Sequence, residues 1–447
     1  MPSPAEQEPT FATAPEFLPK GDPSPEYEQD FARKLEAVER AVVEHATPFH
    51  LYDERGIRAT ARELRRAFDW VPDYRNFFAV KALPNPRILK ILSEEGMGAD
   101  TSSGPEIVLA HRAGIRGQEI MFTSNNTSAE EFKRARKADA IINFDDIGFI
   151  GYYQREVGKL PRTACLRYNP GDAKGGNPII GEPVEAKYGL TTEQLPAGYA
   201  QLRDGGVERF GLHTMVASNE RDPEYFAETA RIIFEQARRV TAETGVRLDF
   251  INLGGGFGIP YEPGQARLDL RLVSEKIELE YRKAFGMLGP RIVTEMGRLV
   301  TGPHGVLVTE ARHLMDKYRK YVGVDATMAD LMRPGMYGAY HHLTVLRPRG
   351  EGAKVYDVVG SLCENNDKFA VQRELPEIQP GDVLIIHDTG AHGRAMGFNY
   401  NGTLRCGELL LHEDGELELI RRAETEADYF ATLDVLSQTD SPASSES

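Results

Sequence analysis

The chain has 447 residues, 41% of them hydrophobic and 27% charged, which is the composition of an ordinary globular protein with ample apolar material for a core. Its length predicts two domains, or one large α/β barrel with an appended unit. The formal net charge of −15 argues against a protein that binds the phosphate backbone of nucleic acids or an anionic membrane surface.

The two ends of the chain carry no structural or targeting signal. Residues 1–25 and 433–447 are polar and low in complexity, so we expect disordered tails. No apolar run approaches the ~18 residues of a membrane span, and the first residues lack the pattern of a secretory signal. Three cysteines without a C-x-x-C pair argue against a disulfide framework and a thiolate zinc site. A cytoplasmic enzyme is the expectation.

From about residue 74 to 298, short β-prone runs alternate with stretches of helical period. The β-prone runs are Phe77–Lys81, Met97–Thr101, Ile120–Ser124, Ala140–Phe144, Thr163–Tyr168, Arg209–Met215, Leu248–Leu253 and Arg291–Glu295. Eight βα units in about 225 residues predict a closed (β/α)₈ barrel, with an open doubly wound sheet as the alternative.

The helix expected between the sixth and seventh strands has clear ends. Asp222 suits the N-cap and Pro223 the first helical position. Apolar residues recur at helical spacing from Phe226 to Val240, and Gly245 suits the C-terminal cap.

After about residue 300 the pattern becomes mostly strand-like. The runs are Val306–Glu310, Tyr321–Asp325, Val355–Gly360, Val383–His387 and Leu404–His412, followed by a hairpin signal at Glu413–Glu416. We therefore expect a barrel over residues 51–300 and a C-terminal β domain over 301–432. Residues 26–50 are expected to join the β domain.

Chemistry in a barrel belongs to the C-terminal ends of the strands and the loops that follow them. Lys81 closes the first strand, where partial burial of its ammonium would favour Schiff-base formation with an aldehyde. Gly254, Gly255 and Gly256 follow the seventh strand and suit a phosphate cradle. Glu295 ends the eighth strand and suits a partner for a protonated ring nitrogen.

Each of these features also has a structural explanation, namely a solvated strand-end lysine, a tight turn and a Glu–Arg pair. Together they match the three contacts that a pyridoxal 5'-phosphate cofactor needs, which makes the combination more specific than any member. Arg298 and Arg333 could each grip a carboxylate, and Cys363 beside Glu364 suits proton delivery. The histidines show no metal-ligand spacing, so no metal site is expected.

The chain resembles the fold-type III pyridoxal-phosphate decarboxylases, and among them the diaminopimelate decarboxylases, from about Phe49 to Phe430. The motifs that carry the resemblance are Phe78–Ala82, Asp100 before Ser102–Glu106, Arg167–Pro170, Lys187–Gly189, Gly254–Gly256, Glu295–Arg298, Arg333–Tyr337, Cys363-Glu364 and Phe398–Asn401.

The resemblance implies a role for each site residue. Lys81 would bond to the cofactor aldehyde, Glu295 would pair with the pyridine nitrogen, and Cys363 would return a proton after CO₂ loss. The further cofactor contacts implied are Asp100, His213, Met215, Ser218, Gly254, Gly255, Gly256 and Tyr400. The substrate contacts implied are Arg298, Arg333, Tyr337, Glu364 and Tyr400. In this family the Cys–Glu loop enters the site of the other protomer, which implies a homodimer.

The two arginines, Arg298 and Arg333, indicate which substrate the enzyme accepts. A far end that is only cationic, as in ornithine or lysine, would be repelled by them, whereas meso-2,6-diaminopimelate carries both a carboxylate and an ammonium there. The family member implied is thus a decarboxylase that makes L-lysine and CO₂. A decarboxylase of ornithine, lysine or arginine is the main alternative. Two other classes of protein are less consistent with the sequence. A cofactor-carrier protein on the same barrel would lack the β domain expected at 301–432. A racemase would need a second base, commonly a tyrosine, where Cys363 stands.

Three positions depart from the family pattern. Met215 stands where a histidine usually stacks on the cofactor ring, His392 where a tyrosine is common, and Asn366 where a glycine is usual. A thioether can lie against an aromatic ring, so cofactor binding should survive. These departures indicate a divergent subgroup.

Overall fold

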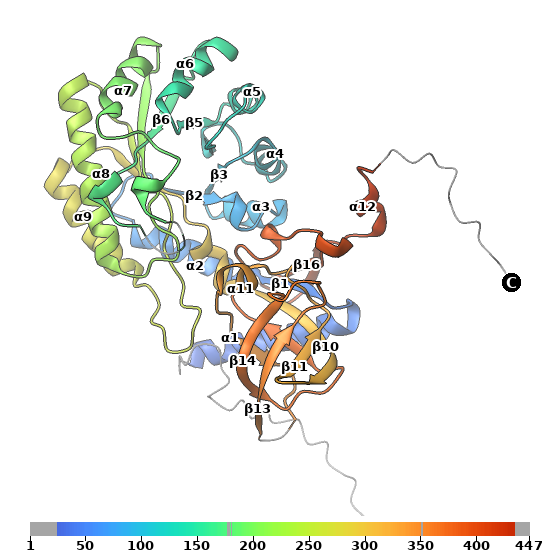
Figure 1. Ribbon diagram of the computed structural model, residues 1–447. Coiled ribbons are helices and arrows are strands. Elements are labelled where there is room, and N and C mark those ends of the chain that lie inside the picture. Colours follow the sequence, from blue (N-terminus) through green and yellow to red (C-terminus); the bar gives the residue numbers. More distant parts are fainter. Residues whose placement is uncertain (1–24, 177–178, 180, 350–351, 434–447) are drawn as a thin grey trace, which may run out of the picture.

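The computed structural model describes residues 25–433 except 177–178, 180 and 350–351 (Figure 1). The tails predicted at 1–25 and 433–447 lie, apart from their innermost residues, outside the described part. Within it, no helix is long and apolar enough to cross a membrane.

Eight parallel strands close into a barrel, as predicted, and the open-sheet alternative is wrong. The strands are β2 (Arg75–Ala79), β3 (Gly98–Thr101), β4 (Ile120–Thr123), β5 (Ile141–Phe144), β6 (Thr163–Arg167), β7 (Arg209–His213), β8 (Phe250–Asn252) and β9 (Arg291–Thr294). Pairing of β2 with β9 completes the ring. A cluster of buried side chains from six of these strands, including Phe77, Met121 and Phe250, forms a core separate from the one under the helices. The alternation of side chains along each strand produces these two cores.

Helices surround the barrel and bury their apolar faces against it (Figure 1). They are α2 (Glu54–Ala67), α3 (Pro86–Glu94), α4 (Gly104–Arg112), α5 (Ala129–Lys137), α6 (Ile147–Glu156), α7 (Gln194–Asp204), α8 (Pro223–Thr244) and α9 (Leu270–Phe285). The predicted ends of α8 are confirmed, because the Asp222 side chain accepts a hydrogen bond from the Glu224 amide and Gly245 adopts a φ of 72°.

The remaining strands form a second, mixed sheet with the order β14-β13-β11-β10-β1-β16-β17, which β15 and β12 join through β10. They are β1 (Phe49–Asp53), β10 (Gly305–Asp316), β11 (Lys320–Val324), β12 (Leu343–Val345), β13 (Ala353–Val359), β14 (Lys368–Pro376), β15 (Val383–Ile386), β16 (Gly407–Leu411) and β17 (Leu417–Arg421). Short helices α10 (Arg298–Thr301), α11 (Arg333–Tyr337) and α12 (Glu426–Phe430) accompany them.

The N-terminal part of the chain belongs to this second sheet. β1 pairs antiparallel with β10 and parallel with β16. Helix α1 (Pro25–Glu44) packs Val38 and Ala41 against buried apolar side chains of this sheet. The chain therefore starts in the β domain, forms the barrel and returns. The boundary predicted at residue 51 falls inside β1, which is continuous with its sheet through Asp53.

Candidate active site

Lys81 lies at the barrel mouth, but not at the end of a strand. β2 ends at Ala79, and residues Val80–Ala82 form a turn of 3₁₀ helix in which the Lys81 side chain is exposed. The prediction that a strand end buries its ammonium is therefore wrong for this single chain, because the turn leads the lysine out of the strand. The backbone N–H of His392, from the β domain, donates to the Ala82 carbonyl at 2.9 Å and ties this turn to the other domain.

Glu295, directly after β9, has two side-chain partners inside the barrel mouth. His213 Nε2 lies 3.0 Å from Glu295 Oε2, and Asn252 Nδ2 donates to Oε1 at 2.7 Å. Burial alone would raise the pKa of Glu295, but His213, Asn252 and the charge of Lys81 outweigh it and hold that pKa below its usual value. The result is an ionised carboxylate in a buried position.

The tautomer of His213 follows from its second contact. Asn143 Nδ2 lies 2.9 Å from His213 Nδ1, so with the amide in this orientation Nδ1 accepts and Nε2–H donates to Glu295. His213 thus lies between Asn143 and Glu295 and orients the carboxylate.

Asp100, at the end region of β3, is buried near Glu295. Burial raises the pKa of Asp100 well above its usual value, and the Glu295 charge acts in the same direction. Its Oδ1 is buried without a hydrogen-bond partner in the described part of the chain. An unpaired buried polar atom is costly unless a further group satisfies it.

The glycine loop after β8 admits no side chains. A Cβ on Gly254 would lie 2.3 Å from the Thr214 carbonyl oxygen, and one on Gly255 would lie 2.6 Å from the Glu295 carbonyl oxygen. Gly254 and Gly256 also have φ values of 68° and 102°, which only glycine adopts readily. The half-buried Met215 lies against this loop, where its Sδ accepts from the Gly255 N–H at 3.2 Å.

The two predicted carboxylate-binding arginines are brought together, and both are buried. Arg298 begins α10 and donates from Nη1 to the Tyr261 hydroxyl at 2.6 Å and from Nη2 to Ser218 Oγ at 3.4 Å. Arg333 begins α11, and its guanidinium carbon lies 4.5 Å from the centre of the Tyr261 ring. Burial lowers the pKa of Arg333, and the charge of Arg298 contributes in the same direction.

The charges of Lys81, Arg298 and Arg333 all act on His392. Burial and then the charges of Arg298, Lys81 and Arg333 lower the pKa of His392 well below its usual value. Its φ is 56°, an uncommon conformation for a residue with a side chain. A neutral imidazole therefore faces three cations, and such a concentration of positive charge suits an anionic ligand.

The predicted proton donor lies elsewhere on the chain. Cys363 is exposed and its backbone N–H donates to Asn401 Oδ1 at 2.9 Å, which places it beside Tyr400. Glu364 and Tyr337 are also exposed. No contact in the described part of the chain joins Cys363 or Glu364 to Lys81, Glu295 or the arginines.

Sequence reasoning missed three residues of the site: Tyr261, His341 and Asn143. Tyr261 follows the glycine loop in the run Gly258–Tyr261, and its nearness to that loop was the only local signal. The other two acquire their roles through partners 8 and 70 residues away in the sequence.

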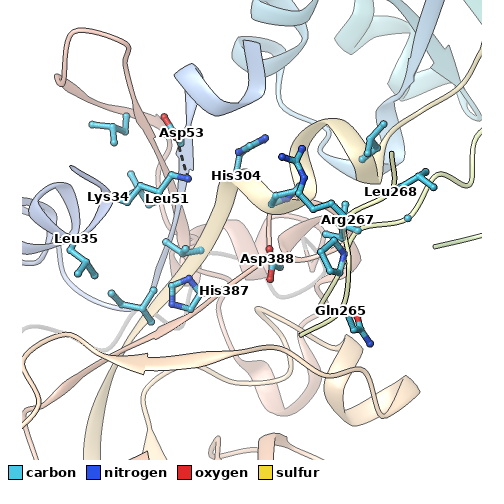
Figure 2. A pocket seen from close by; sticks show the side chains of 18 of the residues that line it. Lys34, Leu35, Leu51, Asp53, Gln265, Arg267, Leu268, His304, His387 and Asp388 are labelled. Carbon is cyan, nitrogen blue, oxygen red and sulfur yellow. Dashed lines mark ion pairs between the residues drawn. The ribbon is translucent and has the colours of Figure 1, made fainter. Parts of the chain in front are cut away.

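A cavity of about 500 Å³ lies between α1 and the loop that leads to α9 (Figure 2). Lys34 and Asp53, which form an ion pair at 3.5 Å, line one side, and Gln265, Arg267 and Leu268 line the other (Figure 2). Lys81 and Glu295 do not line it. It is therefore distinct from the barrel mouth.

The residues at the mouth fit pyridoxal 5'-phosphate. The unsatisfied Asp100 Oδ1, the ionised Glu295 and the loop without Cβ atoms are the environment expected for a bound ring with one protonated nitrogen and a phosphate.

Comparison with known proteins agrees with this fit. The family "Pyridoxal-dependent decarboxylase, pyridoxal binding domain" matches residues 54–302. Protein TabA of Pseudomonas amygdali pv. tabaci is 44% identical over 406 residues, which cover 90% of this chain and 94% of TabA. The diaminopimelate decarboxylase of Methanothermobacter thermautotrophicus is 36% identical over 400 residues, covering 88% and 92% of the two chains.

Solved structures show the same architecture. The diaminopimelate decarboxylase of Helicobacter pylori complexed with L-lysine superposes with a TM-score of 0.81 at 30% identity, covering 88% of this chain and 98% of the other. With a matching family over more than half of the chain and relatives of this identity along nearly its full length, the protein belongs to the pyridoxal-dependent decarboxylases.

Proposed function

We propose that this enzyme decarboxylates meso-2,6-diaminopimelate to L-lysine and CO₂, the last step of lysine biosynthesis. The observation that carries the proposal is the pair of buried guanidinium groups, Arg298 and Arg333, which share Tyr261 and whose charges act on His392 together with that of Lys81. The relatives named above as diaminopimelate decarboxylases support it.

The chain's own residues would hold the cofactor in a fixed orientation. Lys81 would bind its aldehyde carbon, and Glu295, oriented by His213 and Asn252, would hold a proton on the pyridine nitrogen. Asp100, Ser218, Tyr400 and the Gly254–Gly256 loop would complete the contacts. The N–H groups of Gly254 and Gly255 already donate to Asn252 Oδ1 and Met215 Sδ within the chain. When bound, pyridoxal phosphate supplies an electron sink for the carbanion left by CO₂.

The arginines would select the substrate by its far end. A carboxylate there gains charge-assisted hydrogen bonds from Arg298 and Arg333, with Tyr337 as a further contact. The ammonium beside it would pair with Glu364. Ornithine and lysine have no distal carboxylate, so their ammonium would meet the two guanidinium groups and be repelled.

The proposed proton donor implies a homodimer. Cys363 and Glu364 are exposed on the β domain, together with Tyr337 and Tyr400, whose side chains are 56% and 54% exposed. Exposed aromatic residues of this kind are enriched in interfaces. In a dimer the Cys363 loop would enter the partner's barrel mouth and return a proton to the carbon that loses CO₂. All three cysteines are free, which fits a reducing compartment, and we place the enzyme in the cytoplasm.

A second candidate keeps the cofactor and the fold but decarboxylates another amino acid, such as ornithine, lysine or arginine. Met215 favours it, because this side chain departs from the family pattern and engages the Gly255 N–H in the proposed phosphate cradle.

CO₂ release tests the proposal. Purified protein loaded with pyridoxal phosphate is incubated separately with meso-diaminopimelate, ornithine, lysine and arginine. We expect release from diaminopimelate by the wild type and none by Lys81→Ala, which should also lose the visible absorbance of the lysine-bound cofactor. Lys90→Ala, which alters an exposed lysine of α3, is the matched control and should retain both. Turnover of another substrate without turnover of diaminopimelate would refute the proposal.

A further inference from the structure

Tyr261 contacts both arginines of the proposed carboxylate-binding pair. Its hydroxyl accepts the 2.6 Å hydrogen bond from Arg298 Nη1, and its ring centre lies 4.5 Å from the guanidinium carbon of Arg333 and 5.8 Å from that of Arg298. The tyrosine is itself buried, at 6% exposure, so it is held between them rather than lying on the surface.

The two guanidinium groups need such a partner because they repel each other. In a buried position this repulsion is weakly screened, so without a fixed neighbour each arginine would move toward solvent. An aromatic face carries partial negative charge and attracts a cation, while the phenol oxygen offers a lone pair to the second one.

The chain of contacts continues from Arg333 into the β domain. Arg333 Nη1 lies 2.8 Å from His341 Nε2, and His341 Nδ1 lies 2.7 Å from the His387 carbonyl oxygen. Burial, aided by the Arg333 charge, lowers the pKa of His341 to about 3, so the imidazole is neutral, donates from Nδ1 and accepts from Arg333. The His341 ring also meets Tyr261 edge-on at 5.1 Å. Arg333 is thus fixed on two sides.

We infer that Tyr261 is a positioning residue that sets the distance and orientation between Arg298 and Arg333, and thereby the enzyme's preference for substrates with a distal carboxylate. The inference rests on the proposed function. It adds a residue that would act on the substrate through the two arginines it holds.

The contributions of the hydroxyl and the ring can be separated by substitution. Tyr261→Phe removes the hydroxyl, which accepts from Arg298 and also acts on Arg333, but keeps the ring beside both guanidinium groups. Tyr261→Leu removes both the hydroxyl and the ring. Tyr340→Phe is the matched control. The Tyr340 ring stacks with Arg373 at 3.9 Å and its hydroxyl lies 3.3 Å from His342 Nδ1, and no contact in the described part of the chain joins Tyr340 to Arg298 or Arg333.

The experiment compares two ligands that differ in the distal carboxylate. KM and kcat are measured for meso-diaminopimelate, and Ki is measured for L-lysine as a competitive inhibitor. For Tyr261→Phe we expect the KM for diaminopimelate to rise about ten-fold, the loss of one charge-assisted hydrogen bond, while kcat, the cofactor absorbance and the lysine Ki stay within two-fold. Tyr261→Leu should raise KM further, and Tyr340→Phe should match the wild type.

The outcomes separate this inference from the proposed function. If KM and the lysine Ki rise by the same factor, or if KM does not change in Tyr261→Phe, the positioning role is wrong although the enzyme is a diaminopimelate decarboxylase. If wild-type protein releases no CO₂ from diaminopimelate, the proposed function fails and the inference fails with it. The Tyr261→Phe protein is expected to fold, since the ring that packs against His341 remains.

Discussion

Glu295 is the residue whose state matters most for the proposed chemistry. A carboxyl group buried this deeply would ordinarily be protonated. Here the His213 and Asn252 contacts at 3.0 and 2.7 Å hold the pKa of Glu295 below its usual value, whereas burial raises the pKa of the neighbouring Asp100 well above its usual value. The pKa values of the two acids are therefore shifted in opposite directions, and Glu295 is the one suited to keep a proton on the pyridine nitrogen.

Glu295→Gln tests whether the charge of this carboxylate is needed for the reaction. Glutamine keeps the shape and one carbonyl acceptor but removes the charge, so cofactor binding should persist while kcat for diaminopimelate falls by roughly 10² or more, the scale of losing one preorganised charge. Cofactor absorbance and kcat are measured on the same preparation. A kcat within two-fold of the wild type would contradict the assigned role.

At the scale of elements, the glycine loop after β8 brings backbone N–H groups to the barrel mouth. Gly254→Ala combines a left-handed φ of 68° with a contact of 2.3 Å to the Thr214 carbonyl. We expect the affinity for pyridoxal phosphate to fall at least ten-fold, with about 1–3 kcal/mol of lost stability from the backbone strain.

Gly245→Ala is the matched control for this prediction. Gly245 caps α8 with a similar φ of 72°, but nothing lies within 4 Å of an added Cβ. Gly245→Ala should lower the free energy of unfolding by about 1 kcal/mol. It should leave the affinity for pyridoxal phosphate unchanged, as measured by titration of the apoprotein with the cofactor. Equal losses of affinity in the two variants would mean that the loop acts only through general stability.

The elements predicted from local pattern were largely right, because barrel strands and their helices alternate within short stretches of chain. β12 and β14 were missed. β12 has only three residues, and the polar Gln372-Arg373-Glu374 run interrupts the apolar pattern of β14. The Lys81 turn was also missed, because a 3₁₀ turn has no distinctive sequence pattern when it directly follows a strand.

The site was predictable only where a residue and its role are close in sequence. Lys81, Gly254–Gly256 and Glu295 could be named because each directly follows a predicted strand. Tyr261 and His341 could not, since their function comes from contacts across domains. Cys363 and Glu364 are exposed, and their proposed role depends on the site of a neighbouring chain. Contacts within one chain therefore do not reveal that role.

The whole molecule carries several histidines whose pKa values are lowered. Burial lowers the pKa values of His50 and His341, to about 3 for His341, and desolvation lowers that of the half-buried His392. In the unfolded chain each would take up a proton near pH 6.5, so as the pH falls below this value the unfolded state binds more protons and folding stability decreases. His412, whose pKa is raised overall by Glu54 and Glu418 against the opposing effect of burial, contributes in the opposite direction.

Comparison with His341→Gln isolates one of these groups. The variant should be less stable than the wild type at pH 7.5, and the difference should shrink by about 2 kcal/mol at pH 5, since glutamine takes up no proton on unfolding. Chemical denaturation at both pH values measures it. His313→Gln, at an exposed position of β10, is the control and should show no such change. A His341 difference independent of pH would contradict the neutral assignment.

The proposed dimer predicts complementation between inactive variants. Lys81→Ala and Cys363→Ala chains are co-expressed with different tags, and the hybrid is purified through both. One site of each hybrid would combine an intact Lys81 with an intact Cys363 from the partner, so the hybrid should recover roughly half of the wild-type activity per dimer. If lysine and cysteine act within one chain, the hybrid would contain no intact site and would stay near the activity of the parents.

The proposed function requires that the site select an amino acid with a carboxylate at its far end. Its most direct test is competition in one vessel: wild-type enzyme with pyridoxal phosphate and equal concentrations of meso-diaminopimelate, ornithine and arginine, with products quantified by mass spectrometry. Because Arg298 and Arg333 would attract the one substrate and repel the others, L-lysine should accumulate at least a hundred-fold faster than either amine product. Comparable or faster formation of putrescine or agmatine would contradict the account.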